Sequence, residues 1–135
     1  MDYKLELILI PVTDVDRAKK FYVEQAGFNL LVDVPIGDGQ RIVQATPPGS
    51  ACSIGFGTGV TGAAPGSAQG LHLVVSDIVA ARSELAERGV PVGEVRHIID
   101  GVWQSGPHPQ RASYGSFAEF TDPDGNLWLL QEVNG

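Results

Sequence analysis

A chain of 135 residues can bury the core of one globular domain, and its 43% hydrophobic and 19% charged residues exclude a disordered tail. The net charge of −7 would repel phosphate backbones and anionic lipid headgroups, so we expect neither nucleic acid nor a membrane as a partner. The single cysteine, Cys52, cannot form a disulfide within the chain, and residues 1–12 lack the features of a signal peptide. These features predict a soluble cytoplasmic protein.

The first part of the chain predicts a strand, a helix and three further strands. Residues 5–12 are short, apolar and β-branched, which is typical of a buried strand. Asp14 can cap a helix that carries apolar residues at helical spacing, and Gly27 is typical of its end. Turn residues then separate three predicted strands, at 28–34, 40–46 and 51–57.

After residue 57 the composition changes and the pattern then starts again. Residues 58–69 are dominated by Gly, Ala, Pro, Ser and Thr, which is typical of a linker. The sequence then predicts a strand at 71–75 and a helix that is capped by Asp77 and ends at Gly89. The rest predicts extended segments at 90–99, 114–121 and 126–133, with a long irregular connection at 100–113.

This restart is an internal repeat. The sequence Val-Thr-Asp-Val at 12–15 corresponds to Val-Ser-Asp-Ile at 75–78, and the order of the elements repeats with it. The repeat predicts an α+β fold in which residues 1–135 form a single domain of two tandem β-α-β-β-β modules, at 1–57 and 70–135. Since one small sheet cannot bury both of its faces, we expect the two curved mixed sheets to form a cup.

The motifs resemble the vicinal oxygen chelate superfamily, which includes glyoxalase I, bleomycin-resistance proteins and extradiol dioxygenases. The resemblance rests on residues 11–18 with Phe21 and Tyr22, on residues 75–78, and on residues 120–126 leading to Gln131 and Glu132. It implies the paired-module fold and a homodimer whose cups are built or completed at the subunit interface. Because the superfamily is chemically diverse, the resemblance alone does not specify a reaction.

The resemblance also implies where a metal would bind. Metal-dependent members hold a divalent ion with His and Glu at four cup positions, which correspond here to Leu7, Ser53, Gly70 and Leu129. These residues lack the imidazole and carboxylate donors that such ions require. A shift of two residues, which keeps the same side of each strand, gives Leu9, Gly55, His72 and Gln131, and these do not make a site either. We therefore predict no metal and no cofactor.

The candidate ligand-binding residues follow from the same side-chain alternation and from the long connection. We expect His72 on the concave face, either contacting a ligand and acting as a candidate catalytic group or hydrogen-bonded within the sheet. Trp103 could stack on a flat ligand or simply cover a helix, and Arg111 could neutralise an acidic group on the ligand. The full predicted set is Leu7, Leu9, Ser53, His72, Trp103, Arg111, Tyr114, Leu129 and Gln131.

Four functions are compatible with these residues. The first is metal-independent binding of a small, aromatic or apolar molecule, as in the bleomycin-resistance branch that the chain resembles. The second is a metal-dependent lyase, isomerase or dioxygenase, and the third is metal-free acid–base catalysis by His72 on a small molecule. The fourth is an interacting subunit without catalysis. We favour the first hypothesis because aliphatic residues stand at the metal positions.

Overall fold

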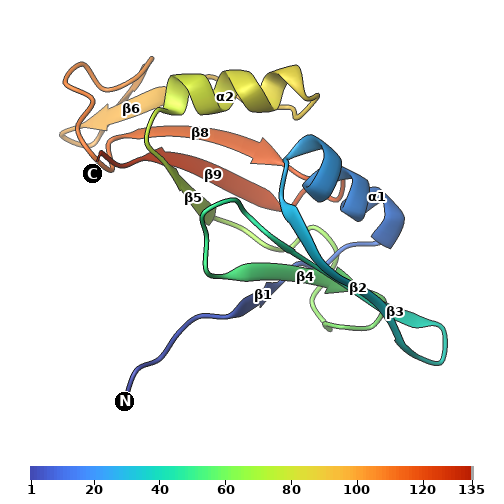
Figure 1. Cartoon of the computed structure of the whole chain (residues 1–135). Helices are drawn as coiled ribbons and strands as arrows, with labels where there is room; N and C mark the ends of the chain where they lie inside the picture. The colour runs from blue at the N-terminus through green and yellow to red at the C-terminus, as the bar shows by residue number, and fades with distance from the viewer. Residues whose placement is uncertain (135) are drawn as a thin grey trace. The chain divides into compact units, whose positions relative to one another are not determined.

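The computed structural model describes residues 1–134 and contains two mixed β-sheets and two α-helices (Figure 1). The chain divides into two compact units. The first consists of Met1–Ala68 with Asp122–Asn126, and the second consists of Gln69–Thr121 with the chain from Leu127 onward. The predicted α+β class with two tandem strand–helix–strand modules is confirmed. No helix within residues 1–134 is long and apolar enough to cross a membrane.

The first unit contains a four-stranded sheet in the order β1-β4-β3-β2, in which β1 is parallel to β4 and the other neighbours are antiparallel. Asp14 caps the helix as predicted, because its carboxylate accepts a hydrogen bond of 3.0 Å from the Arg17 backbone N–H. The α-helix continues directly into a π-helical segment. The elements are β1 (Leu7–Leu9), α1 (Val15–Lys19), η1 (Lys20–Gln25), β2 (Asn29–Gly37), β3 (Gln40–Thr46) and β4 (Ser53–Gly57).

The core of the first unit lies between one face of this sheet and the helical segment. The Phe56 ring from β4 lies 5.5 Å from the Tyr22 ring of η1, measured between centroids. Ile54 and Phe56 are buried on β4, and Val43 and Ala45 are buried on β3. Because side chains alternate along a strand, the intervening residues point to the opposite, helix-free face.

The second unit contains a five-stranded sheet in the order β5-β9-β8-β6-β7, with β5 parallel to β9. Asp77 caps its helix as predicted, since its carboxylate accepts a hydrogen bond of 3.1 Å from the Ala80 N–H. Gly89 follows the helix with a positive φ of 89°. The elements are β5 (Leu71–Val75), α2 (Ile78–Glu87), β6 (Arg96–Ile99), β7 (Val102–Ser105), β8 (Ser116–Thr121) and β9 (Leu127–Glu132).

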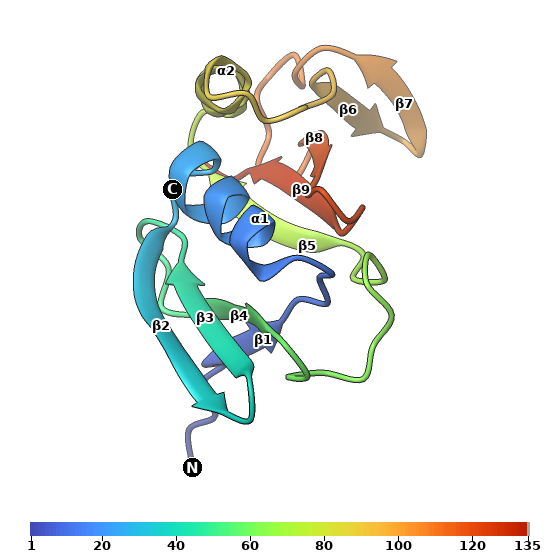
Figure 2. The ribbon, with the colours of Figure 1, turned by 90° about the vertical axis from the view of Figure 1, so that its right-hand side faces the viewer.

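One element differs from the sequence prediction. The connection expected to be irregular at 100–113 contains β7, which pairs with β6 to form a hairpin at the edge of the sheet (Figure 2). Asp100 and Gly101 form its two-residue loop, with positive φ angles of 51° and 76°. An Asp-Gly pair is a strong hairpin signal because the matching turn needs positive φ at both positions. Trp103 therefore lies on a strand.

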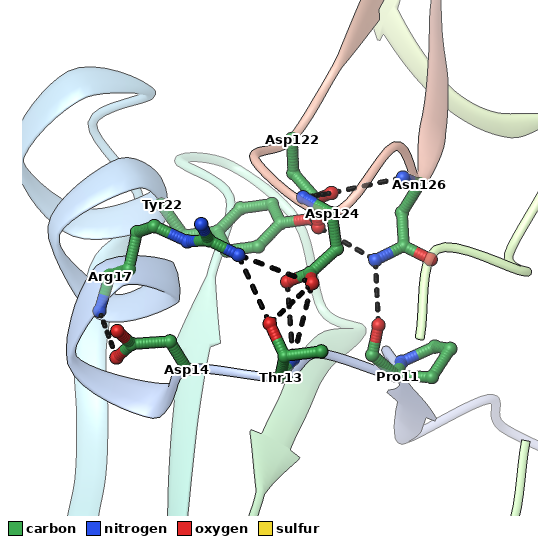
Figure 3. A network of polar contacts seen from close by, with 8 residues as sticks. All are labelled: Pro11, Thr13, Asp14, Arg17, Tyr22, Asp122, Asp124 and Asn126. Carbon is green, nitrogen blue, oxygen red and sulfur yellow. Dashed lines mark hydrogen bonds and ion pairs between the residues drawn. The ribbon is translucent and has the colours of Figure 1, made fainter. Parts of the chain in front are cut away.

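The turn between β8 and β9 belongs to the first unit and is held there by a polar network (Figure 3). The buried Asp122 carboxylate accepts hydrogen bonds from the Tyr22 hydroxyl (2.7 Å), from the Asn126 side chain (2.8 Å) and from two backbone N–H groups of the turn (2.9 Å each). Asn126 also donates to the Pro11 carbonyl oxygen at 2.9 Å. Each buried polar group of the network has a hydrogen-bond partner, so the network stabilises the fold.

Asp124, in the same turn, extends the network to the start of α1. Its carboxylate accepts hydrogen bonds from the Thr13 hydroxyl (2.7 Å) and from the Thr13 backbone N–H (3.2 Å). The Arg17 guanidinium also reaches it, at 3.3 Å. Asp124 and Asn126 of the turn therefore bind the segment that leads from β1 into the helix, whereas Asp122 binds η1.

We expect removal of the Asp122 side chain to destabilise the protein strongly. Asp122→Ala leaves several buried donors without an acceptor and should lower the free energy of unfolding by about 3 kcal/mol. Tyr22→Phe removes one of these bonds and should cost about 1 kcal/mol. Urea unfolding measures both values, with the exposed Asp2→Ala as the control. Equal stability of Asp122→Ala and the control would contradict this role for the turn.

Candidate ligand-binding site

The five-stranded sheet has one face that packs against α2 and one that does not. On β9, Trp128, Leu130 and Glu132 are buried, whereas the alternating residues Leu129 and Gln131 are half-buried. The Glu132 carboxylate accepts a hydrogen bond of 2.9 Å from the Ile78 N–H at the start of α2, so the buried residues face the helix. We call the opposite side the open face; it carries His72, Val74, Arg96, Trp103, Phe117, Glu119, Leu129 and Gln131.

Aromatic rings gather on the open face. The Trp103 ring meets the Phe117 ring edge to face, with 5.4 Å between centroids. The His72 imidazole approaches Phe117 from the other side in the same way, at 6.5 Å. Trp103 is 46% exposed to solvent, although it is one of the largest apolar side chains in the unit. An exposed aromatic group with a fixed neighbour is a surface on which a flat molecule can stack.

Arg96 connects this aromatic group to a carboxylate. Its guanidinium carbon lies 4.6 Å from the centroid of the Trp103 ring, in cation–π contact, and its Nη2 donates to Glu119 Oε1. An open pocket of about 550 Å³ lies beside these three side chains, a volume within the range of small-molecule sites. It is lined by Gly93, Glu94, Val95, Arg96, Trp103, Gln104, Ser105 and Glu119.

The predicted site residues of the first unit lie together on the helix-free face of its own sheet. Leu7 pairs with Ser53, and Leu9 pairs with Gly55. A Cβ atom at Gly55 would lie 3.2 Å from Leu9 Cδ2 and 3.3 Å from Leu7 Cδ1, so both leucines close over the glycine. Ser53 is buried, and its hydroxyl is hydrogen-bonded to that of Thr46 at 2.6 Å. This face is therefore mostly aliphatic.

Four predicted residues of the second unit, His72, Tyr114, Leu129 and Gln131, lie near the β5 side of its sheet. His72 is exposed, and its Nδ1 lies 2.7 Å from the Gly70 carbonyl oxygen, to which it can only donate. Gln131 donates weakly, at 3.4 Å, to the carbonyl oxygen of Tyr114. Tyr114 precedes β8 with a positive φ of 69° and is 63% exposed. Leu129 pairs directly with His72 across the two strands.

Arg111 lies elsewhere, on the side of α2. Its Nε donates to Glu132 Oε1 at 2.8 Å, and its Nη2 contacts both Glu132 and, at 3.2 Å, Asp77. The guanidinium lowers the pKa of the buried Glu132 carboxyl below its usual 4.5, with a further contribution from the Ile78 N–H. The hydrogen bond to Glu132 in turn raises the pKa of Arg111. The structure thus places Arg111 in a support for the helix start and not beside Trp103.

The residues present do not fit the divalent metal of metal-dependent relatives. Of the four corresponding positions, Leu7 and Leu129 carry aliphatic side chains, Gly70 has none, and the Ser53 hydroxyl is engaged by Thr46. Within residues 1–134, no group of three or more His, Cys, Asp or Glu side chains is close enough to hold a metal ion.

Two residues of the open face were not anticipated from the sequence. Arg96 and Glu119 form its charged pair, and neither was singled out as a site residue. The alternation along β8 could have placed Glu119 beside Phe117, but the pairing of β6 with β8 is not visible in the sequence. Only this pairing brings Arg96 opposite Phe117.

A sheet with one helix-covered face and one open face, repeated in two tandem modules, defines a class of small α+β proteins. The family comparison specifies the class: residues 4–130 match the Glyoxalase/Bleomycin resistance protein/Dioxygenase superfamily, and the chain belongs to it. The resemblance inferred from the motifs is confirmed.

Several relatives align over nearly the whole chain. The crystal structure of TnmS3, an antibiotic binding protein from Streptomyces sp. CB03234, is 34% identical with a TM-score of 0.76, covering 98% of each chain. A glyoxalase/bleomycin resistance protein from the same organism is 36% identical with a TM-score of 0.72, covering 95% of this chain and 99% of its own. YetH of Bacillus subtilis (strain 168), an uncharacterized protein, is 26% identical over 93% of this chain and 94% of its own.

The depressed pKa of Glu132 predicts a loss of stability in acid. A carboxyl whose pKa is lower in the folded state stabilises the fold above its unfolded pKa, here about 4.5, and this contribution disappears as the pH falls through the folded value. Glu132→Gln should cost about 1–3 kcal/mol at neutral pH, because Arg111 and the Ile78 N–H lose their charged partner.

The free energy of unfolding, measured by urea titration between about pH 6 and pH 3, should fall less steeply for Glu132→Gln than for the wild type. Glu84→Gln, at an exposed position on α2, is the control and should follow the wild-type slope. Parallel curves for Glu132→Gln and the wild type would refute the assignment.

Proposed function

We propose that the protein binds a small aromatic or apolar molecule on the open face of its five-stranded sheet, without a metal ion. The observation that carries the proposal is the exposed Trp103 ring, fixed against Phe117 and Arg96 at the edge of the 550 Å³ pocket. A rigid, partly exposed indole provides a large contact area at a small entropic cost. The site residues predicted from the sequence that share this face are His72, Trp103, Leu129 and Gln131.

Two further observations support this function. The residues at the metal positions of the superfamily are aliphatic or lack a suitable donor, which favours holding a ligand by shape and stacking. In addition, a relative that is 34% identical over nearly the full chain is described as an antibiotic binding protein. We propose a cytoplasmic location, with which a single unpaired cysteine is compatible.

Calorimetric titration with planar aromatic metabolites and antibiotics tests the proposal. We expect binding to the wild type that is unchanged by a chelator, and a loss of about tenfold or more in affinity for Trp103→Ala, because the stacking surface is removed. Tyr3→Ala, which removes an exposed aromatic side chain from the segment before β1, is the control. Binding that requires an added divalent ion would contradict the proposal.

We propose a homodimer as the working form, as in the superfamily. The helix-free face of the four-stranded sheet leaves Leu9 and Val34 exposed to 37% and 44%, and association of two chains would remove such apolar surface from water. Sedimentation velocity should give twice the chain mass of 14.3 kDa. A concentration-independent monomer would exclude this assembly.

His72 supports a second candidate function, metal-free catalysis of a lyase or isomerase type. Its Nδ1 donates to the Gly70 carbonyl oxygen, so Nε2 is the ring nitrogen available for proton transfer on the same face as the proposed ligand. A His72→Ala variant that binds the ligand normally but no longer converts it would establish this activity. An unchanged ligand recovered from the wild-type complex would exclude it.

A further inference from the structure

We infer that Arg96 selects the charge of the ligand, so that the pocket prefers aromatic acids over aromatic amines. The inference rests on the proposed function and concerns the same site. By aromatic acid we mean a planar ring system bearing a carboxylate or another acidic oxygen. Arg96 would act as a specificity-determining residue beside the ring on which such a ligand stacks.

The first argument concerns the hydrogen-bonding capacity of Arg96. A guanidinium has five N–H donors in a fixed planar arrangement. Among residues 1–134, the Arg96 guanidinium makes one hydrogen bond, from Nη2 to Glu119. Its side chain is 43% exposed, so the remaining donors are accessible from the pocket that it lines. They match the geometry of an acidic oxygen pair, which a guanidinium binds through two parallel hydrogen bonds.

The second argument concerns the orientation of the group. The Trp103 ring covers one side of the guanidinium at 4.6 Å, and Glu119 holds one of its nitrogen atoms. Both contacts fix the side chain before a ligand arrives, which lowers the entropic cost of binding. An oxygen attached to a ring that stacks near Trp103 would reach the free N–H groups without rearrangement of the sheet.

The third argument decides the sign of the preferred charge. The electron-rich face of Trp103 already contacts the Arg96 cation, so a cationic ligand would compete with Arg96 for the ring and be repelled by it. Two carboxylates also line the pocket. Glu119 is paired with Arg96, and Glu94 is exposed without an ion pair among the described residues, so water screens its charge. Arg96 is therefore the charge that a ligand meets beside the aromatic surface.

Three matched probes on one ring system test the inference: 2-naphthoate, 2-naphthylmethylamine and 2-naphthylmethanol. In calorimetric titrations of the wild-type chain we expect the acid to bind about tenfold more tightly than the alcohol, and the amine more weakly than the alcohol. Arg96→Gln should bring the acid to within about twofold of the alcohol. In Arg96→Gln the alcohol should lose less affinity than the acid, because the Trp103 ring remains packed against Phe117.

Two further variants separate the charge of Arg96 from its general effects. Glu119→Gln removes the internal competitor for the guanidinium and should strengthen acid binding, opposite to Arg96→Gln. Arg88→Gln removes the same charge from the exposed C-cap position of α2 and should leave the order of the three probes unchanged. Circular dichroism and urea unfolding establish that each variant is folded.

The outcomes distinguish this inference from the proposed function. If the alcohol binds but the acid has no advantage, or if Arg96→Gln behaves like Arg88→Gln, the charge selection is wrong and the aromatic site stands. Tighter binding of the amine than of the acid would likewise overturn the role of Arg96. If none of the three probes binds to the wild type, both the aromatic site and its charge selection are refuted.

Discussion

The Asp122 carboxylate is the interaction on which the rest of the structure depends. Four donors converge on this one buried side chain, and they come from η1 and from the β8–β9 turn itself. In the sequence, the turn lies between two strands of the second unit, β8 and β9. Residues Asp122–Asn126 of the turn nevertheless make their contacts with the first unit and are part of it. The hydrogen bonds from the turn to η1 and to Pro11 all lie within the first unit. A buried carboxylate is tolerated here because every lone pair has a partner.

The same alternation of side chains that builds each core also produces the candidate site. In both units one face of the sheet is covered by helix, and the residues between the core positions are left on the other face. In the first unit this face is aliphatic around Gly55. In the second it combines aromatic rings with one ion pair. The two modules have thus kept one architecture while the chemistry of their open faces differs.

Local signals predicted most of the fold. Both helix starts follow from Asp14 and Asp77, whose carboxylates cap as expected because capping depends on residues only three positions away. The strand at 40–46 was predicted with its observed bounds, since turn residues flank it on both sides. The sequence analysis missed the β6–β7 hairpin, although the Asp100-Gly101 pair is a hairpin signal. The Gly, Pro and Ser residues around this pair had suggested an irregular segment instead.

The site was less predictable than the fold because it depends on pairings between distant strands. The alternation of side chains along the strands predicted His72 and Leu129 on the same face of the sheet. The structure pairs these two residues directly. Arg111 was expected near the ligand, but its partner Glu132 is 21 positions away and faces α2, which only the folded chain reveals. Arg96 likewise becomes part of the aromatic group through the register of β6 with β8 and β7.

The placement of Trp103 on an edge hairpin has a consequence for how such proteins diverge. The strand β7 pairs with β6 alone, and its four residues are all exposed, so none of them supports the core. Replacing the indole, or altering the length of the two-residue loop, would reshape the stacking surface at little expense to folding. Selection could therefore retune which compound is recognised through this hairpin, while the buried strands of the sheet preserve the scaffold.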